Sequence, residues 1–343
     1  MFNKNLKYYR LQKNMTKKEL ASKVDVTPMA ISHYESGDRR PSMEIIKRLA
    51  QVLDVRVTDF LSNRNTNLVF AHGEFRKKSS MTKTQQDYIR ESVEEYLSRF
   101  YAVVDILGGE VLPKEPAAHQ LEPSGDPEND AQAMRKYLRL AESGPIGNLI
   151  ELLENRGILV YVYETESKDF SGMNGLVNGR PYIIVNGSMS PERIRSTIVH
   201  EIAHLLFRWE DVIDEENMAT AIGGAFLFPK EDAVRELGIR RSAITNDMAL
   251  ICKEYGISMY MLVKRASLCG IINAQIEKSF YIRANKKGWH TDEPIRIGRE
   301  EPMLFNQLVF RAVCENEISV QKGAELLKKS YEYVASQCFA EGE

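Results

Sequence analysis

Apolar residues recur with helical spacing over the first 62 residues of the chain and predict five short helices. A threonine or serine cap opens the second, third and fourth of these helices, and a proline follows the cap of the third. The expected helices are Asn5–Gln12, Thr16–Lys23, a third from Thr27-Pro28, Ser42–Val52 and Val57–Leu61. Their apolar positions would fill one small core. The second and third helices have helix-turn-helix spacing.

Beyond residue 62 the pattern is mostly helical, with one short region of strands. Helices are expected over 81–107, about 127–142, 146–156, 190–207, 214–228, 244–255 and 258–268, and across the region 302–338. Strands are expected near 158–163, 174–178 and 181–186, with Asn178-Gly179 as a hairpin turn. The Pro/Gly-containing stretch 108–127 is expected to be a mobile loop open to proteolytic nicking. The fold class is therefore multidomain, mainly α with a small β-sheet (α+β).

The helix at 190–207 carries the most informative motif, His200-Glu201-Ile202-Ala203-His204. Residues four apart lie on the same face of a helix, so His200 and His204 can reach one metal ion. Glu201 projects at a different angle, where it can act as a base on a water molecule. This H-E-x-x-H pattern is typical of zinc peptidases. The alternative is an amphipathic helix with two surface histidines.

A catalytic zinc usually has three protein ligands, and we expect the third on the next helix, over residues 214–228. Small residues in that helix would let it pack closely beside the histidines. Glu216 is the expected ligand, with Glu215 and Asp214 as the other candidates. Acidic residues also gather at helix N-termini because of the helix dipole, which would explain all three without a metal.

Residues 157–229 resemble the ImmA/IrrE family of bacterial and phage metallopeptidases. The matching pieces are the strands at 158–162 and 181–186, the H-E-x-x-H helix, the segment Glu216–Ala219 and Phe226-Leu227-Phe228-Pro229. Ala219-Thr220-Ala221-Ile222 departs from the Ala-Asn and Phe-Ala that often follow that glutamate. The resemblance implies a zincin-like domain that holds Zn²⁺ through His200, His204 and Glu216, with Glu201 as the catalytic base.

The first 62 residues resemble the XRE/Cro family of DNA-binding domains. The resemblance lies in Lys18-Glu19-Leu20-Ala21, Val26-Thr27, Ile31-Ser32, Tyr34-Glu35-Ser36-Gly37 and Arg40-Pro41-Ser42. It implies a five-helix, lambda-repressor-like fold that contacts double-stranded DNA. The groove-facing positions would be Thr27, Pro28, Met29, Ser32 and His33, with Lys17, Arg39 and Arg40 at phosphates. A small helical protein-interaction domain is the alternative interpretation.

Charge and composition narrow the setting. Residues 1–61 hold twelve Lys/Arg and seven Asp/Glu, an excess of five positive charges in a chain whose net charge is −2. A local basic patch favours phosphate contact. The cysteines at 252, 269, 314 and 338 show no paired metal spacing and are expected to be reduced core thiols. With no signal peptide and no membrane span expected, we expect a cytoplasmic protein.

These observations divide the chain into a DNA-binding domain at 1–62, a connector at 63–127, a peptidase domain at 128–270 and a helical region at 271–343. The predicted function is a DNA-binding regulator with zinc-dependent endopeptidase activity. Its expected substrate is a helix-turn-helix repressor or the chain itself, in stress, prophage or mobile-element control, and a homodimer is expected. The alternatives are a regulator with a non-catalytic zinc domain and an antitoxin that represses its own operon.

Overall fold

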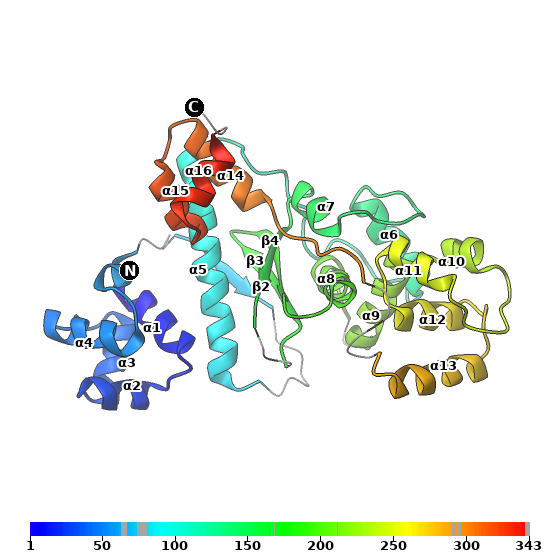
Figure 1. Ribbon diagram of the computed structural model, residues 1–343, viewed down its shortest axis with the longest axis horizontal. Coiled ribbons are helices and arrows are strands. Elements are labelled where there is room, and N and C mark those ends of the chain that lie inside the picture. The colour runs from blue at the N-terminus through cyan, green and yellow to red at the C-terminus, as the bar shows by residue number, and fades with distance from the viewer. Residues whose placement is uncertain are drawn as a thin grey trace. The chain divides into compact units, whose positions relative to one another are not determined.

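The computed structural model describes residues 1–62, 67–73, 81–165, 167, 169–210, 212–289, 293 and 296–339. Helices and one small four-stranded sheet make up these residues, which confirms the predicted fold class (Figure 1). Two compact units emerge: residues 1–70, 75–112 and 304–343 in one, and residues 71–74 and 113–303 in the other. Within the described residues, no helix combines the length and apolar character needed to cross a membrane. The four-part division expected from the sequence stays a prediction.

The N-terminal helices form where the sequence predicts them. They are α1 (Phe2–Gln12), α2 (Lys17–Val24), α3 (Pro28–Ser36), α4 (Met43–Leu53) and the 3₁₀ helix η1 (Val57–Leu61). Thr16, Thr27 and Ser42 cap α2, α3 and α4, and Thr16 and Glu19 form a capping box. Gly37 ends α3 at φ +87°, a conformation that favours glycine. Leu6, Leu20, Ile31, Leu49 and Phe60 are fully buried in the shared core.

One buried ion pair ties the first helix of this core to the third. Arg10 Nε donates to Glu35 Oε1 at 2.5 Å, and Arg10 Nη1 donates to the carbonyl of Met15. Both side chains are about 95% buried. Glu35 therefore neutralises an arginine inside the domain.

The long helix α5 (Lys83–Leu107) packs within the same unit, on α1 and on α14 (Leu304–Cys314). Phe305 of α14 meets Phe100 of α5, and Lys7 of α1 pairs with Glu91. The helices α15 (Val320–Leu327) and α16 (Tyr331–Cys338) complete the group.

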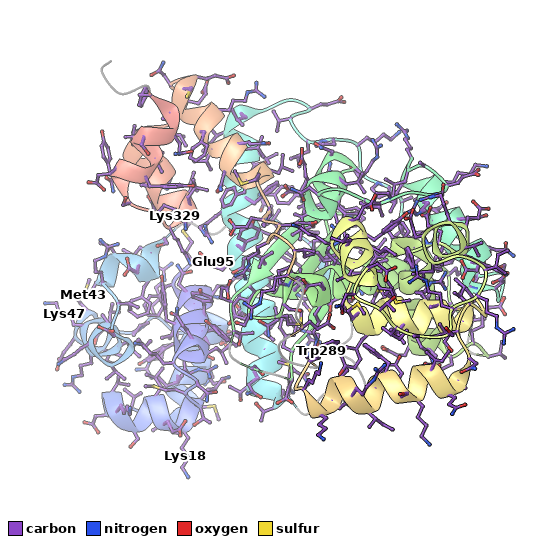
Figure 2. The ribbon with its side chains drawn as sticks, turned by 45° about the vertical axis from the view of Figure 1, so that its right-hand side comes forward. Lys18, Met43, Lys47, Glu95, Trp289 and Lys329 are labelled. Carbon is purple, nitrogen blue, oxygen red and sulfur yellow. The ribbon has the colours of Figure 1, made fainter. Side chains whose placement is uncertain are left out.

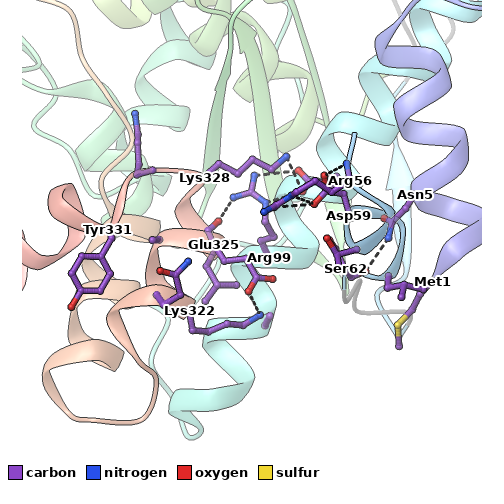
Figure 3. Close-up of a pocket in the computed structure, with 18 of the residues that line it drawn as sticks. Met1, Asn5, Arg56, Asp59, Ser62, Arg99, Lys322, Glu325, Lys328 and Tyr331 are labelled. Atoms are coloured by element: carbon purple, nitrogen blue, oxygen red, sulfur yellow. Dashed lines mark hydrogen bonds and ion pairs between the residues drawn. The ribbon is translucent and has the colours of Figure 1, made fainter. Parts of the chain in front are cut away.

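A groove of about 1310 Å³ lies among α1, η1, α5 and residues 321–332 (Figure 3). On one wall, Glu95 of α5 accepts from Arg99 at 2.9 Å and pairs with Lys328 at 3.0 Å. Arg99 also donates to the carbonyl of Leu326. This cluster of Glu95, Arg99 and Lys328 fastens α15 to α5.

The second unit contains the sheet, whose strand order is β1-β3-β4-β2. β2 (Leu159–Tyr163) is parallel to β4 (Arg180–Asn186), and β3 (Gly172–Val177) is antiparallel to β4. Asn178 (φ +50°) and Gly179 (φ +83°) form the predicted turn. The strand β1 (Phe70–His72) was not predicted, because three residues are too few to show a period.

The helices of this unit differ in length from several predictions. They are α6 (Pro127–Tyr137), α7 (Leu149–Asn155), α8 (Pro191–Leu206), α9 (Glu215–Leu227), α10 (Lys230–Leu237), α11 (Met248–Tyr255), α12 (Met259–Leu268) and α13 (Ala274–Lys286). The helix expected to reach residue 142 ends early because the buried Arg135 binds the carbonyls of Ala141 and Gly144. These bonds satisfy the loop after α6 without further helical turns.

Within the stretch 108–127, the backbone N–H groups of His119 and Leu121 donate to the carbonyls of Leu205 and Leu206 on α8. The mobility of this stretch and its cleavage by proteases stay predictions. The expectation for the cysteines is corrected. The four cysteines are free thiols, but only Cys252 is buried. Cys314 is exposed, so it is not a core thiol.

Candidate functional site

The H-E-x-x-H motif lies in the middle of α8, whose buried stripe includes Ile194, Ile198, Ile202 and Leu205. Pro191 occupies the first turn of this helix, and the Ser190 side chain before it makes no capping bond. α9 packs on α8 through small residues. Ala219 is fully buried, and a side chain on Gly223 would sit 3.7 Å from the backbone nitrogen of His200. Small residues on α9 thus bring it close to the histidines.

This packing brings the three expected ligands together. His200 Nε2 and His204 Nε2 lie 2.9 Å apart. Glu216 Oε2 lies 3.4 Å from His200 Nε2, and Glu216 Oε1 lies 3.8 Å from His204 Nε2. One ligand atom from each residue falls within 4.8 Å of the others, which fits a single ion. Two nitrogens bound tetrahedrally to zinc at about 2.0–2.1 Å are roughly 3.3 Å apart, close to this arrangement.

The partners of the outer ring nitrogens decide which histidine nitrogens carry protons. His204 Nδ1 lies 2.6 Å from Glu215 Oε1, and an ionised carboxylate can only accept, so Nδ1 carries the proton. The Thr220 hydroxyl donates to the carbonyl of Glu216 at 2.9 Å and lies 3.3 Å from His200 Nδ1. It therefore accepts from that nitrogen.

Both Nε2 atoms are then left with lone pairs that point toward each other. Such an arrangement is repulsive unless a cation, either a proton or a metal ion, lies between the two nitrogens. A neutral imidazole with Nδ1 held by an acceptor is also the usual form of a metal-bound histidine. The donor set and its hydrogen bonds thus fit a zinc ion.

The other two acidic candidates, Asp214 and Glu215, bind groups other than the two Nε2 atoms. Asp214 caps α9, because its Oδ1 accepts from the backbone N–H of Asn217 and its Oδ2 accepts from that side chain. Glu215 binds the outer nitrogen of His204, on the ring edge away from Glu216. Among the three acids, Glu216 alone is placed to share an ion with both Nε2 atoms.

Glu201 is buried beside the ligands, with 4% of its surface exposed. Asn174 of β3 donates from Nδ2 to Glu201 Oε2 at 2.8 Å. β3 comes this close because Gly172 has no side chain: a Cβ there would lie 2.6 Å from Thr197 Cγ2 and 3.4 Å from Glu201 Cγ. Sequence reasoning missed Asn174 and Thr220 and considered Glu215 only as an alternative ligand, since partners of this kind lie far from one another in the sequence or look like ordinary helix-capping residues.

The side chains expected at DNA lie on α2, α3 and the turn that follows α3. Thr27, Pro28, Met29, His33, Arg39, Arg40 and Lys17 are exposed, and Ser32 is half-buried. Four of them have intramolecular partners. Lys17 Nζ lies 3.1 Å from Ser32 Oγ, His33 Nδ1 lies 3.5 Å from Asp38, and Thr27 Oγ1 caps α3. Lys18 also points outward on α2 (Figure 2).

Two family models match separate parts of the chain. Residues 6–60 match a family model described as helix-turn-helix. Residues 153–267 match the M78 peptidase model, described as the IrrE N-terminal-like domain. The chain is a fusion of these two domains.

The similar curated proteins match short parts of the chain. The chain is 34% identical over 70 residues to the uncharacterized HTH-type transcriptional regulator YqaE of Bacillus subtilis. It is 38% identical over 61 residues to the HTH-type transcriptional activator BcrR of Enterococcus faecalis. These matches cover 20% and 18% of this chain, and 60% and 30% of those proteins. Both relatives are named as transcriptional regulators.

One solved structure is similar at a low level. It is the crystal structure of Bacillus thuringiensis PlcR in complex with the peptide PapR7 and DNA, with 13% sequence identity and a TM-score of 0.18. The likeness covers 98% of this chain and 94% of that one. A score this low does not establish a shared arrangement of the two chains.

Proposed function

We propose that this chain is a DNA-binding transcriptional regulator whose IrrE-like domain is a zinc-dependent endopeptidase. The observation that carries the proposal is the convergence of His200 Nε2, His204 Nε2 and the Glu216 carboxylate beside the buried Glu201. Three ligands and an adjacent carboxylate are the parts of a catalytic zinc site, whereas structural sites close all four positions with protein groups.

His200, His204 and Glu216 would hold the zinc. When bound in such a site, zinc lowers the pKa of water and polarises a carbonyl group. Glu215 and Thr220 keep the two imidazoles in the tautomer that presents Nε2 to the ion. These contacts orient the ligands before any substrate arrives.

Glu201 acts as the general base. It takes a proton from the attacking water and passes that proton to the leaving amine, so that a peptide is hydrolysed with no net change in the enzyme. The amide of Asn174 holds Oε2 of this carboxylate and so sets the position of the group. A base must lie within hydrogen-bond reach of the proton it removes.

The helix-turn-helix domain would place the chain on an operator. Thr27, Pro28, Met29, Ser32 and His33 would face the major groove, while Lys17, Arg39 and Arg40 would contact phosphates. We propose a homodimer, because domains of this type usually read paired half-sites. The proposed substrate is a helix-turn-helix repressor or the chain itself. Cleavage between the two domains of the chain would separate DNA binding from the rest of the protein.

The substitution Glu201→Gln tests the catalytic part of this proposal. The zinc-loaded wild type and variant are incubated alone and with a purified helix-turn-helix repressor, and products are mapped by mass spectrometry. We expect cleavage by the wild type only. Loss of the base should cost about 10²–10⁴-fold in rate, while zinc content and operator binding remain. Two intact proteins after zinc loading would instead favour a repressor or antitoxin with a non-catalytic zinc domain.

A further inference from the structure

The short strand β1 occupies one edge of the sheet beside the candidate zinc site. Sheet order places it next to β3, and the backbone N–H of Gly73, just after β1, donates to the carbonyl of Asn174 at 2.8 Å. Ala71 to Gly73 group with the IrrE-like unit, although residues 1–70 and the helix α5 belong to the other unit. A few residues of the connector are therefore built into the sheet.

The strand that β1 covers is the one that positions the general base. Asn174 uses its carbonyl to bind Gly73 and its side-chain amide to bind Glu201 Oε2. Gly172, two residues earlier, packs against α8 at Glu201. A polypeptide that paired with this edge of β3 would bind Asn174, and Asn174 in turn binds Glu201.

The contact between β1 and β3 is shaped for this segment. A Cβ on Gly73 would lie 2.7 Å from the Asn174 carbonyl, so no other residue fits there without a shift. Gly175 leaves room for Ala71 and for the hydroxyl of Tyr182, which lies 2.5 Å from His72 Nδ1. This edge of β3 therefore accepts a glycine at one position and a polar side chain at the position before it.

The same strand is short and only partly covered. β1 has three residues, of which Ala71 is exposed and Phe70 and His72 are half-buried. Segments with little buried surface open at low free-energy cost, so β1 can leave the edge while the remainder of the sheet stays folded.

We propose that the edge of β3 is the binding site for an extended polypeptide, and that β1 occupies this site as an intramolecular competitor. Strand addition supplies main-chain hydrogen bonds to any extended chain. The positions that Gly73 and His72 now occupy would select a glycine and a preceding polar residue. The consequence for catalysis rests on the proposed peptidase function: a substrate strand gains access to Glu201 only when β1 has left.

The test measures binding of a peptide, without zinc and without turnover. The probe is a fluorescent synthetic peptide of residues 67–73, and the receptor is the full chain carrying Glu201→Gln. Gly73→Ala places a Cβ against the Asn174 carbonyl and should release β1. His72→Ala removes the contact with Tyr182. Gly147→Ala is the matched control, because a Cβ there meets nothing within 4 Å.

We expect Gly73→Ala and His72→Ala to bind the probe about tenfold more tightly than the parent, since apparent affinity scales with the open fraction of the site. Gly147→Ala should bind as the parent does. A second probe in which valine replaces the glycine should bind more weakly. Thermal melts establish that each variant is folded, and either of the two releasing variants suffices for the comparison.

Equal binding by parent and both releasing variants, or no binding to any, would overturn the proposal and leave β1 as a simple cover for a sheet edge. The outcome is separable from the peptidase proposal. A chain that binds no zinc but shows the tenfold difference keeps the strand site and loses the catalytic function. If the chain cleaves protein but the variants bind the probe no more tightly than the parent, the catalytic function is kept and the strand site is lost.

Discussion

The two units of the chain fix their polar side chains for different purposes. In the IrrE-like unit, three polar groups at the candidate centre each have a second polar partner: Glu215 for His204, Thr220 for His200 and Asn174 for Glu201. In the helical unit, the charged side chains with close partners include ion pairs that join helices, such as Arg10–Glu35, while seven of the eight side chains expected at DNA are exposed. We infer that a zinc site needs side chains whose positions are fixed in advance by hydrogen bonds. Contact with phosphates can instead be made by exposed side chains that are not held in this way.

The largest effect is expected where a structural ion pair is broken. Glu35→Ala leaves the buried Arg10 guanidinium without its carboxylate, which should lower the free energy of unfolding by roughly 3–5 kcal/mol. Chemical denaturation of the full chain measures the change. Glu44→Ala is the control, because Glu44 pairs only with Arg48 on the surface of α4 and should cost about 0.3–0.5 kcal/mol. Similar losses in both variants would contradict a special role for the buried pair.

A second structural cluster should show a pH dependence. Burial raises the pKa of the Glu95 carboxyl, but the charges of Arg99 and Lys328 outweigh it, so the pKa lies below its usual value of 4.5. A carboxyl with a lowered pKa in the folded state adds stability above pH 4.5 and loses it as pH falls further. Glu95→Gln should cost about 1.5–3 kcal/mol near neutral pH and less in acid.

Melting temperatures of wild type and Glu95→Gln between pH 7 and pH 3 check this prediction. The two curves should converge as the solution becomes more acidic. Zinc content and operator binding at neutral pH should be the same in both proteins, because the Glu95 cluster joins helices and touches neither candidate site. A constant gap between the curves would exclude the Glu95 charge as its source.

At the candidate metal centre, in contrast to the two ion-pair clusters, we expect substitutions to change zinc binding more than the stability of the fold. Glu215→Ala removes the acceptor that holds His204 Nδ1 and should weaken zinc binding by about 10–100-fold. Competition with a zinc-binding dye gives the affinity. Glu231→Ala, an exposed glutamate in the first turn of α10, is the matched control and should leave the affinity unchanged. Complete loss of zinc in Glu215→Ala would indicate that Glu215 is itself a ligand.

The smallest effect per residue is expected on the DNA face. Arg39→Ala or Arg40→Ala should weaken binding about equally for all DNA sequences and lower the salt slope by roughly 0.9 for each phosphate that is no longer neutralised. Binding titrations at several salt concentrations measure the slope. Arg56→Ala, which changes another exposed arginine, beside η1 and paired with Asp59, should leave the slope unchanged. A weakening confined to one DNA sequence would assign the arginine to a base.

Local signals made much of this structure predictable. Caps at Thr16, Thr27 and Ser42 and the turn at Asn178-Gly179 depend on neighbouring residues, so sequence alone locates them. The H-E-x-x-H spacing likewise places both histidines on one helix face. The partner Asn174 and the strand β1 depend on contacts across long stretches of chain. A lone polar residue in a strand, or a three-residue strand in a connector, carries no signal of such a contact.

The zinc content of the purified chain tests the central claim most directly. Elemental analysis after zinc loading and desalting is performed on wild type, His204→Ala, Glu216→Ala and Glu231→Ala. The convergence of His200, His204 and Glu216 predicts about one zinc per chain in wild type and Glu231→Ala, and loss of zinc in the other two. A wild type without zinc, or a Glu216→Ala variant that keeps the ion with undiminished affinity, would contradict the proposed centre.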